Sequence, residues 1–264
     1  MKKIILKIIL AVCLLAVVTF ATLLVRELYI DSQSRSFYDD LFAIMETRPQ
    51  EQDVTNPGSS AGDNPDNPDD PNAPNTPDNR IPYVNFTALK EIFPGIVGWI
   101  NLKYSPINYP IMQHSDNEFY LTRLPDGSNH RSGSIFLDYR NNPDLSDKSI
   151  LIYGHHTRAG DMFGVFKHYR DQEFYDANPT MDLYTPEEEF TLILFAAHVA
   201  DSVRDHPPLE FESDDAFLRY VEQIKSKSVF SSDIEVTADD RIVSLVTCTY
   251  DFNDARLIVV GIIK

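Results

Sequence analysis

Residues 241–264 read RIVSLVTCTYDFNDARLIVVGIIK. Two runs rich in Val, Ile and Leu, RIVSLVTCTY (241–250) and RLIVVGIIK (256–264), flank a short polar segment. This pattern is typical of two β-strands joined by a turn. It predicts an antiparallel hairpin, in which Arg256 would return beside Cys248.

Further strand-like runs precede this hairpin, and Asn, Asp, Gly and Pro turns separate them. They are VGWINL (97–102), INYPIMQ (107–113), GSIFLD (133–138), SILIYG (149–154), MDLYT (181–185) and EFTLILFAAHVA (189–200). About eight strands with few helices predict a mainly β fold, a closed barrel or a sandwich. A short helix is expected at 86–93, FTALKEIF.

One longer helix is predicted at 214–229, in the segment before the cysteine strand. Its apolar residues Phe217, Tyr220, Val221 and Ile224 follow the i, i+3, i+4, i+7 spacing of an amphipathic helix. Ser213 is placed to cap its N-terminus.

The N-terminus carries an apolar stretch, Ile8–Val25, without a charged residue. A helix of this length crosses a bilayer core of ~30 Å at ~1.5 Å per residue. Lys2, Lys3 and Lys7 favour the cytoplasmic side. The sequence therefore predicts a single-pass anchor within residues 1–30, with a cytoplasmic N-terminus and the rest of the chain extracellular. A cleaved signal peptide is the alternative, although its apolar region is usually shorter.

Residues 31–80 are expected to form a stalk and a linker. The stalk, up to about residue 48, has apolar residues at helical spacing. Prolines then recur every third residue from Pro65 to Pro77, among Asn and Asp. A period of three matches polyproline II, so this segment is interpreted as an extended spacer. A single globular domain is expected at 81–264.

The charge balance excludes one class of partner. The chain of 264 residues has a formal net charge of −17. A nucleic-acid surface needs clustered Lys and Arg, so no nucleic-acid partner is expected.

The chain has two cysteines, Cys13 and Cys248. Cys13 falls in the apolar N-terminal stretch, so Cys248 is the one thiol expected outside the membrane. An odd cysteine in an exported protein suggests a reactive thiol or an intermolecular bridge. A buried, inert core cysteine is the alternative.

A nucleophilic thiol needs a proton acceptor nearby, and histidine is the usual one. Of seven histidines, His155 follows the apolar run SILIYG and so lies at a strand end. His198 lies inside an apolar strand and is expected in the core. Four other histidines are expected on the surface: His114, His130, His168 and His206. Metal-ligand spacings such as HExxH or CxxC do not occur, and no metal site or cofactor is expected.

Arg256 has two interpretations. A hairpin would let it donate hydrogen bonds to an oxyanion that develops near Cys248. Alternatively, it is a solvated strand-end arginine paired with Asp254, a kind of surface pair that contributes little.

These residues resemble the sortases. SLVTC (244–248) is similar to their TLxTC signature, with Ser244 in place of the first threonine. LIYGHH (151–156) resembles the segment with their catalytic histidine, and Arg256 falls at the position of their catalytic arginine. GWINL, INYPIMQ, SIFLDYRN, YGHHTRAGDMFG, TCTYDFNDAR and the helix before the cysteine strand resemble class B sortases. The resemblance covers residue 86 to the C-terminus.

This resemblance implies a membrane-anchored cysteine transpeptidase with a closed eight-stranded β-barrel. Cys248 would attack the threonine carbonyl of a sorting signal, typically of the Asn-Pro-x-Thr-x kind. His155 would protonate the leaving amine, and Arg256 would hold the oxyanion or the substrate backbone. The implied partners are a surface protein that bears the signal and an amine on a cell-wall precursor or a pilin.

The resemblance also implies a signal pocket, lined by Asn108, Met112, Tyr153 and Val246. Val246 stands where Ser is often found, which leaves the polarity of the pocket open. Two alternatives to a sortase remain on the sequence alone: a secreted cysteine protease that transfers the acyl group to water, and a non-catalytic cell-surface module.

Overall fold

The computed structural model of the chain describes residues 2–45, 84–157, 160–201, 205–248 and 255–264. Its helices are α1 (Lys2–Met45), α2 (Phe86–Ile92), α3 (Gln172–Ala177) and α4 (Asp214–Ser226), with 3-10 helices η1 (Phe119–Thr122) and η2 (Phe163–Arg170). Its strands are β1 (Ile96–Asn101), β2 (Asn108–Met112), β3 (Ile135–Leu137), β4 (Ser149–Tyr153), β5 (Thr180–Tyr184), β6 (Glu189–Asp201), β7 (Ile242–Cys248) and β8 (Ala255–Ile263).

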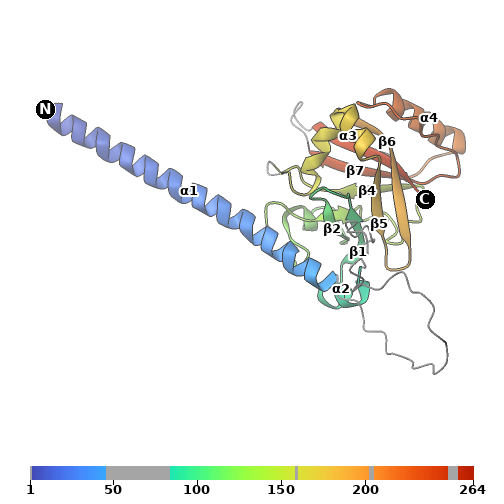
Figure 1. Cartoon of the computed structure of the whole chain (residues 1–264), viewed down its shortest axis with the longest axis horizontal. Helices are drawn as coiled ribbons and strands as arrows, with labels where there is room; N and C mark the ends of the chain where they lie inside the picture. The colour runs from blue at the N-terminus through green and yellow to red at the C-terminus, as the bar shows by residue number, and fades with distance from the viewer. Residues whose placement is uncertain (1, 46–83, 158–159, 202–204, 249–254) are drawn as a thin grey trace, which may run out of the picture.

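The strands form a closed barrel in the order β1-β2-β3-β4-β7-β8-β6-β5, which confirms the predicted barrel. Most neighbours are antiparallel, but β2 and β3 are parallel, and so are β4 and β7. Parallel neighbours need a crossover connection. The segment between β2 and β3, which contains η1, is one such crossover, and the chain from β4 passes through β5 and β6 of the same barrel before it returns to β7 (Figure 1).

Strands β7 and β8 are buried on both faces, which explains their continuous apolar sequence. Alternate residues of β7, such as Val243 and Leu245, belong to the core inside the barrel. The intervening residues Ile242 and Val246 belong to a second core. Helix α4 covers this outer face with Phe217, Val221 and Ile224.

Helix α4 begins where the sequence predicts. The Ser213 side chain accepts a hydrogen bond from the backbone N–H of Ala216, as an N-cap does. The helix ends at Ser226, so the expected extension to residue 229 is not helical.

Helix α1 runs without a break through the apolar stretch and the expected stalk, and its last part packs on the barrel (Figure 1). Tyr38 and Leu41 are 5% and 1% exposed. The Tyr38 ring contacts Tyr109 at 4.9 Å between centroids, and Phe42 contacts Trp99 at 6.1 Å. The packed unit thus includes residues before 81, the expected domain start. The Pro-rich linker lies outside the described residues.

Within the described part of the chain, one helix is long and apolar enough to cross a membrane. This helix is α1, over Val12–Phe42, with a mean hydropathy of 1.9. It is the candidate membrane anchor.

Candidate active site

The three expected catalytic residues lie at neighbouring strand ends. In the parallel pair of β4 and β7, Tyr153 lies opposite Val246, and the Gly154 N–H donates to the Val246 carbonyl over 3.1 Å. His155 follows Gly154, and Cys248 is the second residue after Val246. The segments that carry His155 and Cys248 therefore meet at one end of the barrel.

The hairpin of β7 and β8 is confirmed by its register. Cys248 lies directly opposite Arg256 in this antiparallel pair. Opposite residues of such a pair have Cα atoms about 4.5–5.5 Å apart. The backbone of Cys248 is described and its side chain is not.

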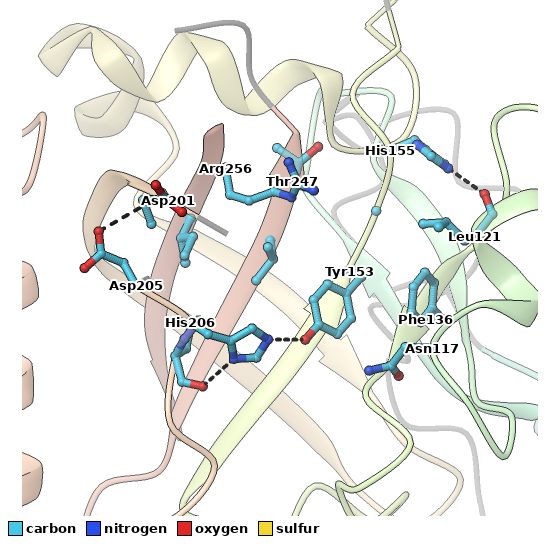
Figure 2. Close-up of a pocket in the computed structure, with 15 residues that line it drawn as sticks. Asn117, Leu121, Phe136, Tyr153, His155, Asp201, Asp205, His206, Thr247 and Arg256 are labelled. Carbon is cyan, nitrogen blue, oxygen red and sulfur yellow. Dashed lines mark hydrogen bonds between the residues drawn. The ribbon is translucent and has the colours of Figure 1, made fainter. Parts of the chain in front are cut away.

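The His155 ring is held by a backbone carbonyl. Its Nε2 lies 2.5 Å from the Leu121 carbonyl oxygen, and Figure 2 shows the ring turned toward that residue. A carbonyl only accepts hydrogen bonds, so Nε2 carries a proton. The other ring nitrogen, Nδ1, is then the one left to exchange a proton with a substrate or a thiol.

The backbone around His155 is tightly packed. A Cβ on Gly154 would lie 2.4 Å from Ile135 Cδ1 and 2.6 Å from Phe163 Cδ2. The Phe163 N–H donates to the His155 carbonyl over 3.1 Å. Only glycine leaves room for the chain to turn here between β4 and His155.

Arg256 is partly buried at the start of β8, and its Nη1 donates to the Ala255 carbonyl over 3.1 Å. Asp254, the partner in the alternative interpretation, lies outside the described residues. Arg256, His155 and Thr247 line the same pocket (Figure 2).

This pocket has a volume of about 270 Å³. Tyr153 and Val246, two of the four residues expected to bind the signal, line it. Its remaining wall is of mixed character: Asn117, Leu121, Phe136, Gly154, Ala200, Asp201, Asp205, His206, Pro207 and Ile258. Pockets that combine apolar walls with a few polar groups are typical of ligand sites.

Asn108 and Met112, the other two expected binding residues, do not line this pocket in the part of the chain that the structure describes. Met112 is fully buried in the barrel core. The Asn108 Oδ1 accepts a hydrogen bond of 2.7 Å from Trp99 Nε1. Both lie on β2, which is separated from β4 by β3.

Asn117 and Leu121 line the pocket instead, and the sequence reasoning missed them. They belong to the crossover from β2 to the parallel strand β3. A parallel pair was not predicted, so nothing indicated that this polar segment passes over the strand ends. Only the crossover seen in the structure places Asn117 and Leu121 at the pocket.

Four histidines were expected on the surface: His114, His168 and His206 are exposed there, and His130 is not. His206 lines the pocket, and its Nε2 lies 3.3 Å from the Tyr153 hydroxyl. His130 is buried, 6% exposed, and its Nε2 lies 3.0 Å from the Ile30 carbonyl of α1. His198 is in the core as predicted, and burial lowers its pKa to about 4.

No group of three or more His, Cys, Asp or Glu side chains that could hold a metal ion occurs among the described residues.

Comparison with known proteins agrees with this fold, although no protein-family model matches the chain. A sortase B of Listeria monocytogenes is 33% identical over 175 residues, which are 66% of this chain and 71% of the relative. A solved Staphylococcus aureus sortase B–substrate complex has a TM-score of 0.65 at 33% identity, over 68% of this chain and 84% of the solved one. Sortase B from Bacillus anthracis in complex with AAEK1 has a TM-score of 0.63 at 36% identity, over 67% and 83%.

The barrel is therefore that of the sortases, enzymes that work as cysteine transpeptidases. The chain belongs to the sortase B family. It is accordingly a transpeptidase that takes sorting signals as substrates and amines as acceptors. Nothing in these similarities favours a hydrolytic protease or a non-catalytic module.

Proposed function

We propose that Cys248 is the nucleophile of this transpeptidase, with His155 as its acid and base and Arg256 as its oxyanion donor. The observation that carries this assignment is the meeting of β4, β7 and β8 at one end of the barrel, with His155 and Arg256 lining one pocket there.

The reaction divides into two steps. The thiol proton of Cys248 passes to His155 Nδ1 as the sulfur attacks the threonine carbonyl carbon of the signal, and a tetrahedral intermediate forms. His155 gives its Nδ1 proton to the leaving amine as the C–N bond breaks, which leaves a thioester on Cys248. An acceptor amine then attacks the thioester and returns a proton to His155, and the new amide leaves as the Cys248 thiolate is released.

Arg256 supports both steps from the opposite strand. Its guanidinium is always charged and presents several N–H donors in a fixed plane. A donor of this kind stabilises the negative oxygen of each tetrahedral intermediate more than the planar carbonyl before it. The register opposite Cys248 supports this role.

The pocket is proposed to receive the sorting signal, of the Asn-Pro-x-Thr-x kind. Tyr153 and Val246 remain as binding residues, joined by Asn117 and Leu121 of the crossover. The acceptor is proposed to be an amine on a cell-wall precursor or on a pilin.

The enzyme is proposed to be a single-pass membrane protein. Lys2, Lys3 and Lys7 would keep the N-terminus of α1 in the cytoplasm. The span would end at Val25, since Arg26 and Glu27 follow. The barrel would then lie outside the cell, where wall precursors and surface proteins occur.

The assignment is tested with the full chain in detergent, in a Cys13→Ala background that leaves Cys248 as the remaining thiol. A sorting-signal peptide is added with and without a peptide amine, and the enzyme and products are analysed by mass spectrometry. We expect an acyl adduct on Cys248 and, with the amine, a transpeptidation product in place of the free acid. Cys248→Ala should abolish both products, and an adduct elsewhere or activity without Cys248 would refute the assignment.

A further inference from the structure

The carboxylate of Asp138 lies behind the pocket wall and connects two of its residues. Asp138 follows β3 directly, and its side chain is fully buried. It does not line the pocket in the described part of the chain, so it has no place in the chemistry above. Two of its hydrogen-bond partners, Asn117 and Tyr153, nevertheless line the pocket.

Arg140 fixes the plane of this carboxylate. Its Nε donates to Asp138 Oδ1 and its Nη2 to Oδ2, each over 2.8 Å. The Arg140 backbone N–H adds a bond of 3.0 Å to Oδ1. Two parallel bonds from a guanidinium hold a carboxylate in one orientation.

Asp138 remains ionised in spite of its burial. Burial alone would raise the pKa of its carboxyl, but the hydrogen bonds from Arg140, Asn117 and Tyr153 outweigh it and lower the pKa to about 2. The group is therefore charged near neutral pH and only accepts hydrogen bonds there.

Oδ2 of Asp138 also accepts from two residues of the pocket wall. Asn117 Nδ2 donates over 2.9 Å and the Tyr153 hydroxyl over 3.0 Å. The Asn117 Oδ1 in turn accepts from the backbone N–H of Tyr139 over 3.0 Å. The carboxamide of Asn117 is thus fixed at both ends, which leaves one orientation for its face on the pocket.

The bond from Tyr153 has a consequence for the pocket. A hydroxyl has one hydrogen, and Tyr153 donates it in the hydrogen bond to Asp138. The hydroxyl oxygen of Tyr153 therefore presents only acceptor lone pairs to the pocket, where His206 Nε2 lies 3.3 Å away. The Tyr153 ring itself is held by stacking on Phe136, at 5.2 Å between centroids.

We propose that Asp138 is a positioning residue for sorting-signal binding, because it orients the Asn117 carboxamide and the Tyr153 hydroxyl that face the pocket. The proposal rests on the proposed role of this pocket as the signal site. Asp138 acts through its two partners and makes no contact with the substrate. The alternative is a purely structural ion pair with Arg140, which is 43% exposed.

Asp138→Asn separates these two roles. An amide of the same size keeps one oxygen and puts an NH₂ group against donors that need an acceptor. At least one of Arg140, Asn117 and Tyr153 then loses its partner and turns. We expect KM for a sorting-signal peptide to rise about tenfold while kcat stays within about threefold, since the reacting groups are untouched.

Asp240→Asn is the matched control. Asp240 is also a buried carboxylate, 5% exposed, that pairs with a cation, Lys264. It accepts from the Thr237 backbone N–H and hydroxyl and does not line the pocket. A general loss of a buried ion pair would lower the thermal stability of both variants, but only Asp138→Asn should change KM.

A double-mutant cycle tests whether Asp138 acts through Tyr153. Tyr153→Phe removes the hydroxyl that Asp138 holds and keeps the stacked ring. If Asp138 acts in part through Tyr153, its substitution should raise KM clearly less in the Tyr153→Phe background than in the wild type. Additive effects on KM would remove Tyr153 from the proposal.

All variants are made in the full chain in detergent, with kcat, KM and thermal unfolding measured on each. If Asp138→Asn does not fold, Arg140→Lys keeps the charge but loses the planar fork, and KM should rise about threefold. Unchanged KM in the folded variants would overturn this proposal alone. A wild-type enzyme that fails to process the signal peptide would instead refute the proposed function of the pocket.

Discussion

The carbonyl of Leu121 decides which nitrogen of His155 is free for chemistry. Its position depends on Gly133, which has a φ of 55°. A Cβ on Gly133 would lie 2.5 Å from the Leu121 oxygen and 2.6 Å from that of Tyr120. Glycine therefore serves two needs here, a left-handed backbone and a close approach between chain segments. The ring of His155 is oriented by backbone geometry far from it in the sequence.

Arg256 is the residue whose geometry we expect to matter most after Cys248. We predict that Arg256→Lys is nearly as damaging as Arg256→Ala. Lysine keeps the charge but loses the planar set of donors. Loss of one oxyanion donor typically costs ~10²–10³ in turnover, or about 3–4 kcal/mol of transition-state stabilisation. The measurement is kcat/KM on a sorting-signal peptide for the wild type and both variants.

The folding of these variants is checked by circular dichroism, since Leu257, Val259 and the rest of β8 carry the apolar burial. If Arg256 merely balanced a surface carboxylate, lysine would serve as well. A lysine variant within about threefold of the wild type would therefore remove Arg256 from the active site.

Among the secondary-structure elements, those with local signals could be predicted. The β7–β8 hairpin and the capped helix α4 are set by residues close together in sequence, and both are confirmed. The parallel pairing of β2 with β3 has no local signal, because it depends on how the whole barrel closes. For that reason Asn117 and Leu121 could not be placed at the pocket, while His155 at the end of β4 could.

Helix α1 has a role in the structure that the sequence did not predict. The sequence indicates an anchor and a stalk, and the apolar residues of the stalk predict a helix but no surface for it to pack on. In the structure Phe37, Tyr38 and Phe42 contact Phe93 at the end of α2 and Trp99 and Tyr109 of the barrel. Aromatic side chains on both surfaces allow the close packing that composition alone does not reveal.

We predict that Leu41→Ala destabilises the protein by about 2–4 kcal/mol, because it leaves a cavity between α1 and the barrel. Leu41 is 1% exposed, whereas Leu28 on the same helix is 62% exposed. Leu28→Ala is therefore the matched control, with an expected change within about 0.5 kcal/mol. Denaturant unfolding of the full chain in detergent measures both. Equal stability of the two variants would show that α1 is not docked in solution.

At the scale of the whole molecule, the docked end of α1 would determine how far the barrel lies from the membrane if α1 is the anchor proposed above. If the span ends at Val25, the thirteen residues to Tyr38 rise about 20 Å at ~1.5 Å per residue. The Pro-rich segment could reach much further if extended, at ~3.1 Å per residue. It connects α1 to α2, however, and these two helices already contact each other, with Phe37 and Phe93 rings 5.8 Å apart. A segment between two ends that lie close together cannot set the height of the domain.

We therefore predict that deletion of Asp63–Asp78 leaves activity unchanged, both on soluble peptides and on acceptors at the membrane surface. Roughly two dozen residues would still join α1 to α2, which is ample for ends that lie close together. The measurement is transfer of a sorting-signal peptide to a lipid-linked amine in vesicles that contain the full chain, with and without the deletion. Leu41→Asp in the same vesicles is the contrasting variant, because a buried charge would release α1 from the barrel and leave the linker as the only tether. If the linker acts as the spacer, the deletion should reduce transfer to the lipid-linked amine and spare turnover with a soluble amine, and that pattern would contradict docking as the determinant of height.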